Sequence, residues 1–85
     1  MESGTVSVAD SATEIAASDT DRIQIIIRNE GSGTVFIGGN NSVTTSNGFP
    51  IKSNETLTIG DYNGIIYGIV ASGTSDVSFS EEEKA

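Results

Sequence analysis

Carboxylates are the reactive side chains that this sequence has in quantity. The 85 residues include twelve aspartates and glutamates, four lysines and arginines, and neither histidine nor cysteine. Nucleophilic and general-base catalysis near neutral pH usually employs histidine, cysteine or a lysine with a shifted pKa. Two carboxylates held roughly 5–10 Å apart in a cleft can hydrolyse glycosides, but a thin domain of this length has little room for a cleft. We therefore expect no catalytic residues and a protein that is not an enzyme.

Metal binding is the second chemistry that the acidic residues suggest. Calcium takes about 6–8 oxygen ligands. Asp19 with Asp21, or Asp61 beside the glycine turns, would supply some of them. Their spacing does not match a calcium-binding loop, so we expect neither a metal ion nor a cofactor.

Glycine pairs and tyrosines give weaker signals for ligand binding. Residues 31–33 and 38–39 are glycine-rich, but neither opens a helix or precedes the lysine of a phosphate-binding loop. We interpret both as turns. Tyr62 and Tyr67 have the chemistry to stack on a sugar, although a buried ring with a hydrogen-bonded hydroxyl is the commoner use.

The charge balance restricts the partners. A net charge of −8 argues against nucleic acid, which is bound through lysine and arginine, and against anionic membranes. The acidity serves either solubility or adaptation to high salt. No apolar run approaches the roughly 20 residues that span a bilayer, and no signal peptide is visible. We expect synthesis in the cytoplasm.

Two apolar runs, residues 23–27 and 34–37, are predicted to form the centre of the fold. Their isoleucine, valine and phenylalanine favour strands, and the glycines and asparagine between them favour a tight connection. The pattern predicts a β-hairpin. Ile23, Ile25 and Ile27 would share one face, and Ile26 with Phe36 would occupy the other, so we expect burial on both faces.

Further strands are expected around this pair. Pro50 suits an edge strand, Gly68 marks a bulge or close packing, and Asp10 or Ser11 is an alternative helix cap. Short strands between turn signals predict one all-β domain over residues 1–85, a β-sandwich or jelly-roll-like barrel of about seven antiparallel strands. Residues 1–4 and 81–85 are predicted to be flexible tails. The other expected strands are residues 5–9, 13–17, 49–51, 56–59, 65–71 and 76–80.

The longest polar segment, residues 38–48, is expected to cross a surface or an end of the fold. Long ordered loops often carry function. Asn40 and Asn54 each begin an N-glycosylation acceptor pattern. Both matches are interpreted as accidental in a chain this rich in asparagine, serine and threonine.

The order of several short motifs resembles a known family. The first are Arg22-x-x-x-Ile26-Ile27-x-Asn29-x-Gly31, Val35-Phe36-Ile37-Gly38 and Asn47-Gly48-Phe49-Pro50-Ile51. The others are Glu55-Thr56-Leu57-Thr58-Ile59, Tyr62-Asn63-Gly64, Ile66-Tyr67-Gly68-Ile69 and Ala71-Ser72-Gly73-Thr74 with Val77. Together they cover roughly residues 20 to 80. In them the chain resembles the small β-rich virion structural proteins of tailed bacteriophages and related archaeal viruses.

The resemblance implies a structural role on a virion without catalysis. It suggests a capsid decoration (cement) protein, or a surface protein at capsid vertices or on the tail, that binds the major capsid protein or another virion protein. The turn at residues 52–55 is more acidic than in such relatives, which leaves the location on the particle open.

Self-association is expected from the fold class. Edge strands of a small sandwich have unpaired backbone groups, and closed rotational symmetry would satisfy them between copies. We expect a homo-oligomer, first a trimer and then a pentamer. The alternatives are a receptor- or carbohydrate-binding module, with the 38–48 loop as its contact, and a generic oligomerisation domain. The candidate interface residues are Thr5, Val6, Ser7, Val8, Asn40, Asn41 and Val43.

Overall fold

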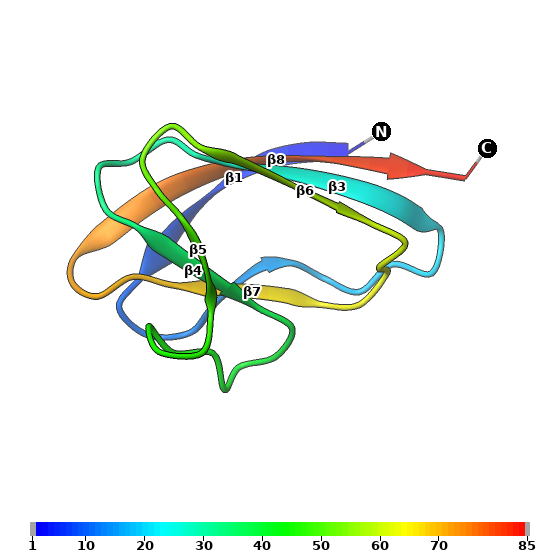
Figure 1. The fold of residues 1–85 in the computed structure, drawn as a ribbon. Coiled ribbons are helices and arrows are strands. Elements are labelled where there is room, and N and C mark those ends of the chain that lie inside the picture. The colour runs from blue at the N-terminus through cyan, green and yellow to red at the C-terminus, as the bar shows by residue number, and fades with distance from the viewer. Residues whose placement is uncertain (1, 85) are drawn as a thin grey trace.

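Eight strands build two antiparallel sheets that face each other across one core (Figure 1). The computed structural model describes residues 2–84, except for the side chain of Glu2, and that range contains no helix. The predicted all-β sandwich is confirmed, with eight strands in place of about seven. The strands are β1 (Glu2–Ala9), β2 (Thr13–Ala16), β3 (Arg22–Asn29), β4 (Val35–Gly38), β5 (Phe49–Ile51), β6 (Thr56–Gly60), β7 (Ile66–Ile69) and β8 (Thr74–Glu83).

The strand order places distant segments side by side. The first sheet has the order β1-β8-β3-β6 and the second has the order β2-β7-β4-β5. β3 and β8 are the central strands of the first sheet, and β7 and β4 are central in the second. The segment predicted at residues 65–71 is therefore a central strand, and Pro50 lies in the edge strand β5, as expected.

Residues 22–38 do not form the predicted hairpin. β3 pairs with β6 and β8, whereas β4 pairs with β5 and β7, so residues 30–34 cross from one sheet to the other. Ile25 and Ile27 meet Val35 and Ile37 across the sandwich core, all four being buried. The alternation of apolar residues is the same whether two strands pair in a hairpin or face each other from opposite sheets. The sequence pattern therefore did not distinguish the two arrangements.

The prediction that both faces of β3 are buried is also wrong. Ile26 is 38% exposed on the outer face of the first sheet. Ile23 lies at a bulge between Arg22 and Gln24 and is 39% exposed, so it does not share the inner face with Ile25.

The predicted tails are largely strand. β1 and β8 pair continuously from Glu2 opposite Glu81 to Ala9 opposite Thr74. Residues 2–4 and 81–83 therefore belong to the first sheet, while Met1 and Ala85 lie outside the described residues. The sequence predicts a solvated tail at residues 81–83, because the partner that allows Glu81 to be buried, Arg22, is distant in sequence.

The core is narrow at one glycine, Gly68, where neighbouring side chains approach the backbone of β7 closely. A Cβ atom on Gly68 would lie 2.8 Å from Cδ1 of Ile15 and 3.3 Å from Cγ1 of Val35. The absent side chain on β7 thus makes room for β2 and β4, as the close-packing interpretation of Gly68 predicted. The main core cluster comprises Val8, Ile15, Ala16, Ile25, Ile27, Val35, Ile37, Ile51, Ile66, Val70 and Val77.

Candidate functional site

A buried arginine begins β3 and organises one end of the sandwich. The Nε atom of Arg22 donates a 2.9 Å hydrogen bond to Oε1 of Glu81 on β8, and the two side chains are 0% and 7% exposed. The terminal nitrogens donate to the carbonyl oxygens of Ala17, at 2.6 Å, and Gly64, at 2.8 Å. A charge removed from water needs such partners. Arg22 therefore joins the β2–β3 and β6–β7 connections to β8.

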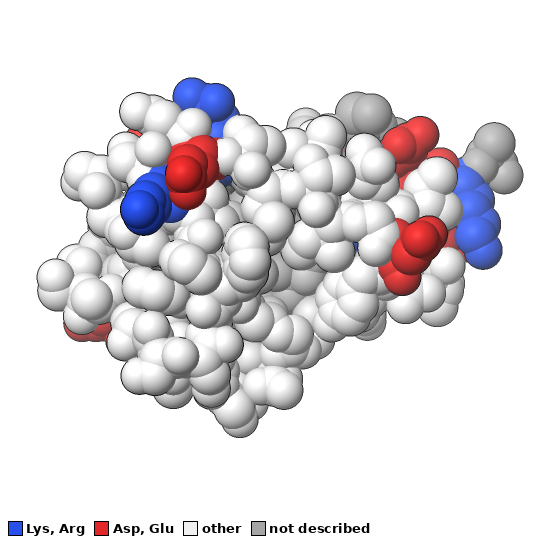
Figure 2. All heavy atoms as spheres, viewed as in Figure 1, with Lys and Arg blue, Asp and Glu red and all other residues white. Residues whose placement is uncertain are grey.

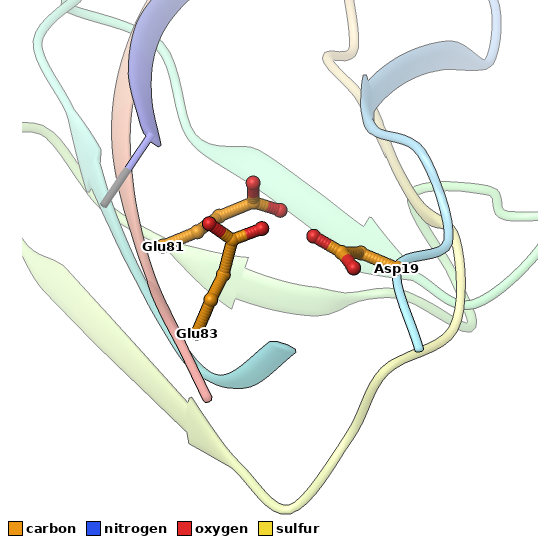
Figure 3. A group of neighbouring side chains, drawn as sticks. All are labelled: Asp19, Glu81 and Glu83. Carbon is orange, nitrogen blue, oxygen red and sulfur yellow. The ribbon is translucent and has the colours of Figure 1, made fainter. Parts of the chain in front are cut away.

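Three carboxyl groups converge beside this arginine (Figure 3). Asp19 reaches the cluster from the β2–β3 connection, and Glu81 and Glu83 reach it from β8. One oxygen from each lies within 4.8 Å of the others. The described start of β1 runs beside the cluster, since Ser3 and Gly4 pair with Ser80 and Phe79 of β8. We call Asp19, Glu81 and Glu83 the acidic cluster.

A hydrogen bond links two members of the acidic cluster. The side-chain hydrogen bond with Glu83 lowers the pKa of Asp19 below its usual range. The backbone N–H of Asp21 and the charge of Arg22 act in the same direction, and desolvation opposes them. These contacts favour the ionised form of Asp19.

A groove opens between the two sheets next to the acidic cluster. It has a volume of about 280 Å³ and lies between the first half of β1 and the segment from β2 to residue 19. Ile15, Ala16 and Phe79 line its apolar part, and Asp19 and Glu81 line its acidic part. A Cβ atom on Gly4 would lie 3.0 Å from the Phe79 ring, so the glycine lets the ring lie against β1. We call this the β1–β2 groove.

A buried asparagine ends β3 and organises the opposite end of the sandwich. Nδ2 of Asn29 donates to the carbonyl oxygens of Gly33, at 2.6 Å, and Ile51, at 2.9 Å. Its Oδ1 accepts from the Gly31 N–H, at 3.0 Å, and from Oγ of Ser75, at 2.8 Å. All four hydrogen-bonding positions of the amide are satisfied. The residue therefore has a structural use, which is to hold the β3–β4 connection against the end of β5 and the start of β8.

Most of one face of the molecule is without charge, and Glu14 of β2, which is exposed opposite Tyr67, lies at its border. Residues 31–51 and 62–75, which contain all of β4, β5 and β7, include no aspartate, glutamate, lysine or arginine. Figure 2 shows this face as a continuous white area over the lower part of the view. Phe36 lies between Pro50 and Ile69 in register on the outer side of the second sheet. We call β4, β5, β7 and the 39–48 loop the uncharged face.

The loop of residues 39–48 is folded onto its own sheet. Val43 is 5% exposed, and a Cβ atom on Gly38 would lie 2.7 Å from the Val43 side chain. Thr44 and Asn47 hydrogen-bond within the loop, the Thr44 N–H donating to Oδ1 of Asn47 at 2.7 Å. The loop is thus built around a buried valine and presents exposed asparagines.

The predicted interface residues fall into two separate places. Thr5 and Ser7 are exposed on β1, and Val6 and Val8 point into the sandwich, Val8 with no exposed surface. Asn40 and Asn41 are exposed on the loop at the opposite sheet, while Val43 anchors it from inside. Only the exposed members, Thr5, Ser7, Asn40 and Asn41, present their side chains to a partner.

The acidic residues suggested for calcium are rearranged by the fold. Asp21 donates its backbone N–H to Oδ1 of Asp19 rather than placing its carboxylate there. Asp61 has a positive φ of 58° in the turn after β6, with its backbone N–H bonded to Ile23. The carboxyl groups that the fold does bring together are those of the acidic cluster, and one of them, Glu81, is paired with Arg22. Tyr62 is partly buried, and its hydroxyl donates to the Ile65 carbonyl at 2.9 Å, as expected of an anchor.

Comparisons with known proteins identify the fold. No protein-family model and no curated protein matches the chain. The dTDP-4-dehydrorhamnose 3,5-epimerase of Bacillus anthracis str. Ames, solved with TDP and PPi bound, is similar with a TM-score of 0.65 and 9% identity. The match covers 100% of this chain and 54% of the epimerase, so the chain spans about half of that enzyme's length. PirA is similar with a TM-score of 0.59 and 16% identity, over 94% of this chain and 93% of PirA.

At these identities the likeness shows a shared fold alone. Between Glu2 and Lys84 no helix has the length and apolar character to cross a membrane. The features that sequence reasoning missed are the acidic cluster and the two buried polar ends of β3. The sequence did contain one signal for the buried polar ends, because the polar residues Arg22 and Asn29 stand at the two ends of an apolar strand.

Proposed function

We propose that this chain is a non-enzymatic virion structural protein, a capsid decoration or vertex protein that binds the shell as a symmetric homo-oligomer. The observation that carries the proposal is the uncharged face on a chain whose net charge is −8. Protein interfaces are depleted of charged residues at their centre. Solubility alone is best served by charge distributed over the whole surface, so a large uncharged area favours a contact surface.

The same charge distribution favours contact between copies. Two copies that meet through the first sheet or its ends would bring carboxylates together, at a cost in repulsion. Contact through β4, β5, β7 and the loop brings no charged side chain of these segments close to another. Phe36 with its neighbours supplies apolar area on the outer side of this sheet, and Phe49, which pairs with Ile37 and is 60% exposed, supplies it at the β5 edge. A trimer on a threefold axis is the first expectation and a pentamer the second.

The chemistry of the side chains supports a role without catalysis. Histidine and cysteine are absent from the sequence. The acidic cluster is committed to a buried ion pair and an internal hydrogen bond, and the buried amide of Asn29 is fully used within the fold. The resemblance in sequence motifs to small virion proteins of tailed phages and archaeal viruses gives the class of particle.

The test is made on particles that contain or lack the protein. A decoration protein should be present in hundreds of copies per purified virion by quantitative mass spectrometry. Particles assembled without it should form but break at lower temperature or lower salt than complete ones. Absence of the protein from mature particles, or particles of unchanged stability, would contradict the proposal.

A second candidate is a receptor- or carbohydrate-binding module. It is favoured by a shallow depression of about 270 Å³ on the loop, lined by Gly38, Gly39, Asn40, Ser42, Val43 and Asn47. Amide and hydroxyl groups of this kind hydrogen-bond to sugars. Glycan binding that is lost when residues 39–47 are shortened, with particle stability unchanged, would favour this candidate over decoration.

A further inference from the structure

The four edge strands of the sandwich differ in how well they are protected against a further strand. β5 is three residues long and contains Pro50, and β2 has four residues, a register shift and Glu14. Such features are the usual means of blocking edges. β6 has five residues and ends at Gly60. β6 and β1 both lack a proline, a lysine and a bulge, but β1 is the longest of the four edges, with eight residues in continuous register.

β1 is therefore an open edge beside an open groove. In the part of the chain that the structure describes, β1 forms a strand ladder with β8 alone, and only its last residue has other partners, since the Ala9 carbonyl accepts from the Val70 N–H and the Ala9 N–H donates to Thr13. The β1–β2 groove runs along its first half, with Ser3 on the rim and Ile15, Ala16 and Phe79 inside. An extended peptide that adds to a sheet edge gains main-chain hydrogen bonds from the strand and side-chain specificity from adjacent pockets. The open edge of β1 and the adjacent groove together have the geometry for such strand addition.

We propose that the β1–β2 groove binds an extended, basic segment of a partner protein, which pairs with β1, inserts an apolar side chain and directs a lysine or arginine to the acidic cluster. The identity of the partner as a shell protein rests on the proposed function. The binding preference itself does not, because it follows from the edge, the groove and their charge.

The charge at the end of the groove selects a basic partner. Asp19, Glu81 and Glu83 contribute three carboxyl groups, against which stands the guanidinium of Arg22. The cluster keeps a net negative charge and lies at the rim, since Asp19 and Glu83 are half-exposed. An incoming ammonium or guanidinium group would be attracted there. Charge-assisted hydrogen bonds of this type are stronger than neutral ones.

A second copy of this chain is a poor occupant of the groove. Of its four basic residues, Arg22 is buried and Arg28 lies 3.4 Å from Glu30, which leaves the exposed Lys52 and Lys84 against twelve acidic residues. A neighbouring copy would bring mainly carboxylates toward the acidic cluster. The groove and the uncharged face therefore suit different partners, a basic segment in the first case and another copy in the second.

The test uses the full chain, labelled with nitrogen-15, and a capped eight-residue peptide of alternating valine with lysine and threonine. The matched probe is the same peptide with glutamate in place of lysine. We expect the lysine peptide to shift the amide signals of residues 3–7 and 16–19, and the glutamate peptide to leave them unchanged. The double variant Asp19→Asn, Glu83→Gln keeps the shapes of both side chains, and we expect it to weaken lysine-peptide binding at least tenfold.

A charge-matched control separates site binding from general attraction. The double variant Asp10→Asn, Glu14→Gln changes the net charge by the same amount at two exposed positions that do not line the groove. It should bind the lysine peptide within twofold of the unaltered chain. Circular dichroism and amide dispersion report whether each variant is folded.

Three results would overturn the proposal. They are equal binding of both peptides, an equal loss in the two double variants, and signal changes that map to the uncharged face or to β6. Dimerisation through residues 3–7 in the absence of peptide would assign the edge to a second copy instead. None of these results depends on particle stability, so failure here and failure of the decoration role are distinguishable.

Discussion

The guanidinium of Arg22 and the carboxylate of Glu81, 59 residues apart in sequence, form a 2.9 Å ion pair enclosed between the two sheets. This contact converts the end of β8 from an acidic tail into the second half of a ten-residue strand. Together with the backbone bond from the Lys84 N–H to the Asp21 carbonyl, at 2.8 Å, it closes one end of the sandwich.

Replacement of Glu81 by glutamine should destabilise the protein strongly. The guanidinium would keep its carbonyl partners but lose the only opposite charge with which it forms an ion pair among the described residues. Loss of one member of a buried pair leaves a buried charge uncompensated, and we expect about 2–3 kcal/mol less free energy of unfolding. Urea unfolding at pH 7 measures it.

An exposed ion pair of the same chain provides the control for that measurement. Arg28 and Glu30 lie 3.4 Å apart with side chains that are 47% and 43% exposed. Solvent screening makes such pairs worth little, so Arg28→Gln should change the free energy of unfolding by less than about 0.5 kcal/mol. Equal losses in the two variants would contradict the structural role assigned to Arg22.

Asn29→Asp should be more damaging than Asn29→Ala although it is closer in shape. Aspartate still accepts from Gly31 and Ser75, but its second oxygen would face the carbonyl oxygens of Gly33 and Ile51 where Nδ2 now donates. A buried charge against two acceptors costs more than an unsatisfied amide site. Thermal unfolding at pH 7 should give the lowest midpoint for the aspartate variant. A higher midpoint for aspartate than for alanine would refute the proposed hydrogen-bond network.

Gly68→Ala should destabilise the core, and a second substitution should restore part of the loss. The new methyl group would overlap Cδ1 of Ile15, at 2.8 Å, and overpacking of this kind costs typically about 1–3 kcal/mol. Ile15→Val removes that Cδ1 atom, so the double variant should lose less than the sum of the single variants. Denaturant unfolding of the four proteins gives the coupling energy. Gly60→Ala, with no atom within 4 Å of the added Cβ, is the control.

Strand content could be predicted from the sequence because local chemistry decides it. Alternating valine and isoleucine, Pro50 in an edge strand, and Gly68 at a close approach each follow from backbone and side-chain rules that act over a few residues. The pairing of β3 with β8 rather than β4 could not be predicted in this way. The pairing depends on which strands share a sheet. Ile25 and Ile27 can be buried equally well beside a neighbouring strand of the same sheet or against the opposite sheet.

The candidate site was less predictable than the fold. Asp19, Glu81 and Glu83 come from segments about sixty residues apart, and nothing in the charged run near the C-terminus marks it as half-buried. The exposed positions among the predicted interface residues, Thr5 and Ser7 on β1, lie on the edge that we propose to be open. The two valines between them contribute to packing, as strand alternation requires.

An acidic substitution on the uncharged face should disrupt self-association. Phe49→Asp adds a carboxylate at the most exposed of the large apolar side chains described and would bring like charges together in a symmetric oligomer. We expect the oligomer to dissociate at least tenfold more readily in sedimentation equilibrium. Thr58→Asp adds the same charge at an exposed position of β6, outside this face, and should have little effect. Equal dissociation of both variants, or a monomeric parent protein, would rule out the proposed copy contact.

The ionisation of Asp19 should depend on Glu83. Its pKa is lowered chiefly by the Glu83 hydrogen bond, with smaller effects from the Asp21 N–H and Arg22. A carboxyl group whose pKa is lower in the folded state stabilises the protein above its unfolded pKa of about 3.9, and this stabilisation is lost as the pH falls through the lowered value. In an NMR titration, Glu83→Ala should move the Asp19 midpoint upward, toward the ordinary value. Asp76→Asn, a change in the first half of β8, should leave it unchanged. An Asp19 midpoint that is the same with and without Glu83 would show that the hydrogen bond between the two side chains does not lower the Asp19 pKa.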